Sequence, residues 1–299
     1  MRWIVTVCVV FMASCMWGQS LENSLLWQIV PAHVGADTSY LFGTVHSKDD
    51  RAFQFGEATL PAMASCAVVV GELDLEKAGP DMFQMLARIR IGDGKTLEDL
   101  YTKKQWERVS AFLNERLGAA SAMTYTTKPF FVLAMLAETE MGDDHAEVLD
   151  QYLMSSAKEN GQRTLGLETV AEQMEALDAI SLKEQASMLL DHVDQDGNPG
   201  EMDAMLDAYA AQDLEKLLAT AEKSGGMPKS MEQALLTERN TRMIHRMDSL
   251  MTVEESAFFL IGAAHLPSPV GLIEGLRAKG YRLEPVYGTK SGAVEFERH

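Results

Sequence analysis

The chain has 299 residues, of which 46% are hydrophobic, and this is enough to form the core of one large domain or two small ones. Its formal net charge of −18 argues against a nucleic-acid-binding protein, because phosphates need a basic protein surface. The same charge argues against adsorption to an anionic membrane face.

The first 18 residues have the pattern of an export signal. Arg2 supplies a positive charge, and residues 3–13 form an apolar run that is too short to span a bilayer as a helix. Cleavage after Gly18 would leave the mature protein. An alternative interpretation is a lipoprotein signal that ends before Cys15, which would then carry a lipid anchor. Both interpretations predict an exported protein that is periplasmic or associated with the cell envelope.

Short apolar strands are predicted near both ends of the chain, with helices between them. The strands are expected over residues 25–30, 38–42, 66–71, 164–167, 257–261 and 281–287. Apolar spacing typical of helices covers residues 103–117, 129–140, 149–159, most of 169–251, and 270–279. The run over 66–71 is typical of a strand that is buried on both faces, as in the middle of an α/β sheet. We therefore predict an α/β domain with a central mixed β-sheet, flanking helices and a large helical insertion.

One four-residue pattern, G-x-x-H, occurs twice, directly after two of these strands. The first copy runs from Gly43 to His46 and the second from Gly262 to His265. In each copy a glycine ends a strand-like segment, and a histidine follows three residues later. Two imidazoles presented in the same way predict one site built from both ends of the chain, and imidazole is a common metal ligand.

Two glutamates also follow predicted strands, Glu72 after residues 66–71 and Glu168 after residues 164–167. Because ligands of open α/β sheets bind beyond the carboxyl ends of the strands, these glutamates and the two histidines are expected to meet there. Two imidazoles and one carboxylate are a ligand set for a catalytic metal, and a second carboxylate can act as a general base. The alternatives are that Glu72 is only the first solvated residue after its strand, and that Glu168 is a residue at a helix N-terminus.

The paired turns and the strand that ends at Glu72 resemble the TraB/GumN family, which includes the Tiki metalloproteases. Other segments that carry the resemblance are Leu149-Asp150, Gly166 to Thr169, Glu172-Gln173, Glu238-Arg239-Asn240 and Leu276 to Tyr281. The resemblance covers residues 23–288, between the export signal and a C-terminal tail over residues 289–299.

The resemblance implies a single α/β domain related to the erythromycin-esterase and ChaN-like folds, and, in the Tiki branch, metal-dependent peptide cleavage. It implies that His46, Glu72 and His265 form the metal or catalytic centre, with Zn, Mn or Co as the divalent metal. Arg239 and Asn240 match a polar family motif and would contact the substrate or support the site. From the residues alone, this pair faces either solvent or the cleft.

We therefore predict an exported metal-dependent hydrolase that acts on peptides. One alternative is a non-catalytic protein of the same fold that binds a small ligand such as heme. Another is a metal-independent esterase that uses one histidine as a general base. The expected partner is a peptide or small-molecule substrate.

Overall fold

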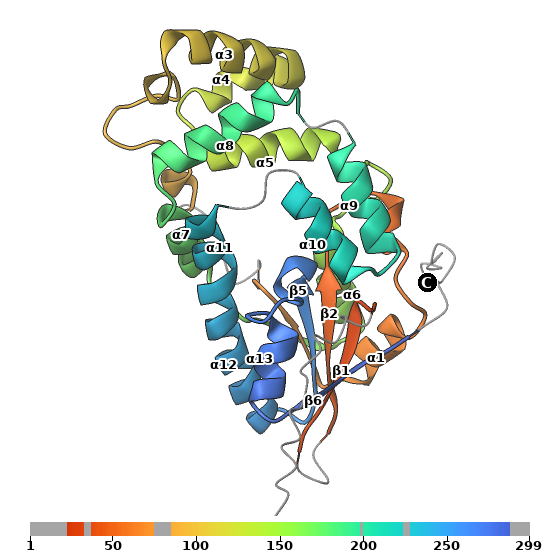
Figure 1. Ribbon diagram of the computed structural model, residues 1–299. Coiled ribbons are helices and arrows are strands. Elements are labelled where there is room, and N and C mark those ends of the chain that lie inside the picture. The colour runs from red at the N-terminus through yellow and green to blue at the C-terminus, as the bar shows by residue number, and fades with distance from the viewer. Residues whose placement is uncertain (1–22, 33–36, 75–84, 198–199, 224–227, 288–299) are drawn as a thin grey trace, which may run out of the picture.

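The computed structural model describes residues 23–32, 37–74, 85–197, 200–223 and 228–287 (Figure 1). The predicted export signal, Cys15 and the C-terminal tail lie outside the described residues. Among the described residues, no helix is long and apolar enough to cross a membrane.

Within the described ranges, six strands form one mixed sheet. They are β1 (Leu26–Val30), β2 (Ser39–Thr44), β3 (Val68–Gly71), β4 (Arg163–Gly166), β5 (Ala257–Gly262) and β6 (Arg282–Pro285). Across the sheet the order is β4-β3-β5-β2-β1-β6. The four neighbours β4, β3, β5 and β2 are parallel, whereas β1 is antiparallel to both β2 and β6. The mixed sheet expected from the sequence is confirmed.

The central strands are covered on both faces, as their continuous apolar sequences require. Val69 of β3 and Phe258 and Phe259 of β5 are completely buried. Side chains of the helices α1 (Thr59–Ser65), α6 (Leu149–Glu159), α12 (Glu238–Val253) and α13 (Leu272–Ala278) are part of the same core. The main hydrophobic core therefore surrounds the sheet.

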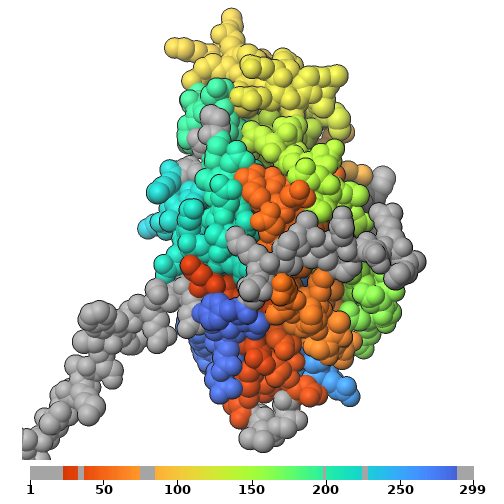
Figure 2. Space-filling view, turned by 90° about the vertical axis from the view of Figure 1, so that its right-hand side faces the viewer, coloured from red at the N-terminus to blue at the C-terminus, as the bar shows by residue number. Residues whose placement is uncertain are grey.

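A second group of helices lies beyond the carboxyl ends of the parallel strands (Figure 1). It contains α3 (Lys103–Leu117), α4 (Ser121–Thr124), α5 (Pro129–Glu140) and α8 (Leu182–Asp194). Val109, Val132, Leu136 and Leu189 are buried in a separate hydrophobic cluster between these helices. Figure 2 shows the yellow residues of α3 and α4 at one end of the molecule. We call this group the helical layer; it comes from the segments in which the sequence predicts a helical insertion.

Local signals in the sequence determine where several helices begin. Thr102 caps α3, and its side chain and that of Gln105 form a reciprocal capping box. Pro129 is the first residue of α5, where its missing N–H costs little. The helices α3, α5 and α6 begin and end at the predicted residues.

Other helices in the described part of the chain are α7 (Val170–Asp178), α9 (Glu201–Ala210), α10 (Leu214–Lys223) and α11 (Lys229–Glu232). The helical segment predicted up to residue 251 is interrupted at one point. A π-helical turn, Gln233–Thr237, separates α11 from α12. Such turns widen the helix locally and occur often near functional sites.

Candidate functional site

The four residues predicted to meet at one edge of the sheet follow four neighbouring parallel strands. Across the sheet the order is Glu168 after β4, Glu72 after β3, His265 after β5 and His46 after β2. Thr44 pairs with Gly262 in the register of β2 and β5, so both histidines leave the sheet at nearly the same level. The structure thus brings all four residues to the carboxyl edge of the sheet.

The two G-x-x-H turns differ in conformation, so the expectation that both histidines are presented in the same way is wrong. After β5 the chain forms a short 3-10 turn, η5 (Ala263–His265), and His265 is only 5% exposed. β2 instead continues through Gly43 to Thr44, and the side chain of His46 is 68% exposed. One imidazole is therefore part of the interior, and the other lies at the surface of the site.

The glycine of each turn allows a close approach. A Cβ atom on Gly43 would lie 3.0 Å from a methyl group of Leu266, and one on Gly262 would lie 3.1 Å from Oε1 of Glu72. Since both distances are too short for an ordinary contact, a side chain at either position would push its neighbour away. Glycine at these two positions therefore allows Leu266 and Glu72 to approach the backbone closely.

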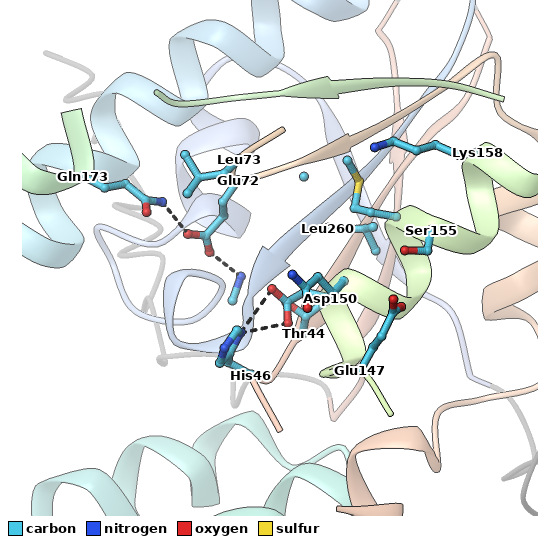
Figure 3. Close-up of a pocket in the computed structure, with 14 residues that line it drawn as sticks. Thr44, His46, Glu72, Leu73, Glu147, Asp150, Ser155, Lys158, Gln173 and Leu260 are labelled. Atoms are coloured by element: carbon cyan, nitrogen blue, oxygen red, sulfur yellow. Dashed lines mark hydrogen bonds and ion pairs between the residues drawn. The ribbon is translucent and has the colours of Figure 1, made fainter. Parts of the chain in front are cut away.

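Glu72 is held through both of its carboxylate oxygens. Oε1 accepts a hydrogen bond of 2.8 Å from the backbone N–H of Gly262. Oε2 accepts a hydrogen bond of 2.7 Å from Arg239. It also accepts one of 3.2 Å from Gln173 (Figure 3). Burial alone would raise the pKa of Glu72, but His265, Arg239 and the Gly262 N–H together lower it. Glu72 is therefore ionised at neutral pH.

Glu168 lies in a buried ion-pair network. Its Oε2 accepts hydrogen bonds from Nε and Nη2 of Arg239, at 2.9 and 2.6 Å, and its Oε1 is 3.3 Å from Arg242. The Glu168 side chain is completely buried, and its ion pair with Arg239 holds the guanidinium group beside Glu72. It also lies directly before Thr169, the N-cap residue of α7.

His265 is held by the second residue of the Arg239-Asn240 pair. Its Nδ1 lies 2.6 Å from Oδ1 of Asn240, and the Asn240 amide N–H donates to the carbonyl oxygen of Val270 at 2.9 Å. That second bond orients the amide, so Oδ1 faces the imidazole and accepts from Nδ1–H. Burial lowers the pKa of His265 to about 4. At neutral pH His265 is therefore neutral, with its lone pair on Nε2.

His46 is held by Asp150, in the first turn of α6. Nδ1 of His46 lies 3.1 and 3.3 Å from the two carboxylate oxygens (Figure 3). A carboxylate can only accept, so Nδ1–H donates and the lone pair of the neutral ring is on Nε2. This hydrogen bond raises the pKa of His46. Asp150 was not predicted as a site residue; Leu149-Asp150, among the segments that carry the resemblance, is the only signal for it.

A cavity of about 440 Å³ lies between this edge of the sheet and α6. Thr44, Glu72 and Gly262 line it from the strands, and Asp150 and Lys158 line it from the helix (Figure 3). We call it the sheet-edge cavity. His46 lines both the sheet-edge cavity and a larger groove beside α5.

The family model of the TraB/PrgY/gumN family matches residues 25–285. The chain belongs to the TraB/PrgY/gumN family. It is 21% identical over 354 residues to Metalloprotease TIKI2 of Danio rerio, with 95% of this chain and 67% of the relative covered. It is 25% identical to Metalloprotease TIKI2 of Xenopus tropicalis, with 88% and 60% covered. Metalloprotease TIKI homolog of Nematostella vectensis is also 25% identical, with 88% and 67% covered.

This TraB/PrgY/gumN protein therefore spans about 60 to 67% of the length of these relatives. No solved structure matches the chain. The α/β class follows from the mixed sheet and its helices.

The metal that these relatives imply can be compared with the donor atoms of the site. Each histidine donates its Nδ1–H to an oxygen, which is the arrangement that leaves Nε2 to bind a metal. The imidazole chemistry of this family member therefore fits a metal. Among the residues that the structure describes, however, no three His, Cys, Asp or Glu side chains lie close enough together to hold one ion. The three-residue centre of His46, Glu72 and His265 stays a prediction.

Proposed function

We propose that this protein is an exported metal-dependent peptidase, in which His46 and His265 bind a divalent metal such as Zn, Mn or Co. The observation that carries the proposal is the matched pair of hydrogen bonds to Asp150 and Asn240, which assign the lone pair to Nε2 in both rings. The metalloprotease names of the relatives support the same function.

The side chains around the proposed metal have distinct roles. When bound, the metal would polarise water and the carbonyl group of the scissile bond. Glu72, which is ionised, would accept the proton of the attacking water as a general base. Arg239 would keep Glu72 ionised and in position, since it bonds to both Glu72 and Glu168.

The proposal is tested by replacing each histidine. His46→Ala and His265→Ala should each abolish metal uptake and lower hydrolysis of a peptide pool by about 10²-fold or more. His245→Ala is the matched control, because His245 is exposed on α12. Metal content is measured by elemental analysis, and hydrolysis is measured with and without a chelator. Hydrolysis that both variants retain would overturn the proposal.

The same assay separates the two alternatives. A metal-independent esterase would cleave ester substrates in the presence of the chelator. A heme-binding protein would give a heme absorbance band with added hemin and would cleave no peptide.

The proposed export is tested separately. We propose that residues 1–18 direct export, as their sequence pattern indicates. The intact mass of the secreted protein should correspond to a chain that begins at Gln19, or to a lipid-modified chain that begins at Cys15. The relationship to the erythromycin-esterase and ChaN-like folds is likewise a proposal, based on the resemblance of the sequence motifs.

A further inference from the structure

The hydrogen bonds around Glu72 use the two oxygens of its carboxylate to different extents. A carboxylate oxygen has two lone pairs and can only accept. Oε2 accepts from Nη2 of Arg239 at 2.7 Å and from Nε2 of Gln173 at 3.2 Å, so both of its lone pairs are used. Oε1 accepts from the Gly262 N–H at 2.8 Å, and the described part of the chain supplies no donor for its second lone pair. Oε1 is therefore the oxygen that can accept a proton from another molecule.

Oε1 also lies beside the buried histidine of the candidate site. A Cβ atom on Gly262 would lie 3.1 Å from Oε1 of Glu72 and 3.8 Å from Cδ2 of His265, so both atoms face the same side of this glycine. In the imidazole ring Cδ2 is bonded to Nε2, which carries the lone pair because Nδ1–H donates to Asn240. Oε1 and the Nε2 edge of His265 are thus neighbours across Gly262.

The start of α7 determines where Gln173 lies. Thr169 and Glu172 form a capping box, in which the side chain of each residue accepts from the backbone N–H of the other. Glu172 also accepts from Arg246 of α12 at 2.9 Å. Gln173 is the next residue, and its side chain lines the sheet-edge cavity beside Glu72 (Figure 3). The backbone that carries Gln173 is therefore held at the edge of the sheet.

The amide group of Gln173 can face the glutamates in one orientation only. Nε2 is 3.2 Å from Oε2 of Glu72 and 3.5 Å from Oε2 of Glu168. Because both carboxylates only accept, an amide oxygen in this place would face two acceptors with no proton between them. The NH2 group must therefore face both glutamates. Unlike the guanidinium of Arg239, this donor is neutral, so it orients the carboxylate of Glu72 without adding charge.

We propose that Gln173 is a positioning residue: together with Arg239 it occupies Oε2 of Glu72, so that Oε1 accepts the proton of the attacking water. This inference rests on the proposed peptidase function and identifies the reacting atom of its general base. An O–H bond of the water breaks, its proton goes to Oε1, and the water oxygen bonds to the carbonyl carbon of the substrate. The proton then passes to the leaving nitrogen as the C–N bond breaks.

The test uses Gln173→Met, which removes the amide donor and keeps a side chain of similar length. Both ion pairs of Arg239 remain, so the variant is expected to fold. Gln151→Met is the matched control, because Gln151 is an exposed glutamine of α6 that lines the same cavity. Hydrolysis of a peptide is measured as kcat and KM, and metal content is measured by elemental analysis.

Gln173→Met should lower kcat by about tenfold and leave KM and metal content within about twofold of the natural values. A loss in kcat alone indicates a group that acts in the transition state, whereas a merely structural role would lower metal content as well. Gln151→Met should change none of these quantities. An unchanged kcat in Gln173→Met, or a fall in metal content that accounts for the lost activity, would overturn the inference.

Crystal structures of the metal-free protein test the same inference without hydrolysis. In the natural protein an ordered water should lie about 2.5–3.0 Å from Oε1 of Glu72, with none on Oε2. In Gln173→Met a second water should bind to the lone pair of Oε2 that the amide no longer uses. Water on Oε2 rather than Oε1 in the natural protein, or no new water on Oε2 in the variant, would contradict the assignment. If both waters are found as expected but no peptide is cleaved, the assignment stands and the peptidase proposal fails.

Discussion

The two candidate histidines form hydrogen bonds with different partners and differ in burial, so their pKa values shift in opposite directions. His46 is exposed and bonds to the carboxylate of Asp150, which raises its pKa. His265 is buried and bonds to the neutral amide of Asn240, and burial lowers its pKa to about 4. Near neutral pH, His265 is therefore neutral. A proton and a metal ion would compete for the imidazole of His46.

Replacing Asn240 tests the assignment of the proton on His265. Asn240→Ala removes the acceptor for Nδ1–H and should lower metal affinity by about 10- to 100-fold. Asn240→Asp keeps an acceptor oxygen and should preserve the Nε2 lone pair, while raising the pKa of His265. Nitrogen-15 NMR of the imidazole rings reports the tautomer directly. A protonated Nε2 in the natural protein would contradict the assignment.

The pH behaviour of the metal-free protein gives a second test. His46 should titrate above the ordinary value of 6.5, and Asp150→Asn should move its pKa down, because the hydrogen bond from Nδ1–H loses its charged acceptor. His265 should titrate near pH 4 in both proteins. Proton NMR of the imidazole C–H signals measures both values. An unchanged titration of His46 in Asp150→Asn would show that the two side chains do not interact.

The buried His265 also affects stability in a defined direction. Its folded-state pKa of about 4 lies below the unfolded value of 6.5, so the unfolded chain binds more protons between these two values. The contribution of His265 to stability is therefore present above pH 6.5 and is lost as the pH falls toward 4. The raised pKa of His46 acts in the opposite sense, because its contribution is present at low pH and is lost as the pH rises through the folded-state pKa.

At the scale of single elements, helix α12 contacts both the glutamates and the buried histidine of the candidate site. Arg239 bonds to Glu72 and Glu168, the next residue Asn240 bonds to His265, and Arg246 bonds to Glu172. A π-helical turn, Gln233–Thr237, lies directly before α12, and such turns are frequent at functional sites. One helix therefore positions groups that follow β3, β4 and β5.

Removal of Arg239 tests how much this helix depends on its ion pairs. Arg239→Met leaves two partly or fully buried carboxylates near each other, and should lower the free energy of unfolding by about 3 kcal/mol. This value is at the low end for a buried pair because Arg242 still bonds to Glu168. Urea unfolding measures the change. Arg282→Met, at an exposed ion pair, is the control and should change stability by less than about 0.5 kcal/mol.

Local features of the sequence predicted the helices better than they predicted the site. The ends of α3 and α5 depend on neighbouring residues such as Thr102 and Pro129, which can be recognised without knowing the fold. The hydrogen bond between His46 and Asp150 instead joins residues 104 positions apart, and its existence depends on how α6 packs against the sheet. Periodicity contains no information about such a pairing.

At the scale of the whole molecule, the candidate site lies between the sheet and the helical layer (Figure 1). The sequence predicted that His46, Glu72, Glu168 and His265 follow strands, and the parallel order of β4, β3, β5 and β2 brings them to one edge. The difference in burial between the two histidines was not predictable from the repeated G-x-x-H pattern, because a 3-10 turn follows β5 whereas β2 continues to Thr44. The sequence therefore predicted the location of the site better than its detailed geometry.

The most direct test of the proposed centre is an anomalous difference map from a crystal of the metal-loaded protein. We expect one peak between the two histidines, bonded to Nε2 of His46 and Nε2 of His265 at about 2.0–2.1 Å if the metal is zinc. The hydrogen bonds from Nδ1 to Asp150 and Asn240 should remain. A peak elsewhere, or no peak at this position in crystals saturated with metal, would contradict the account.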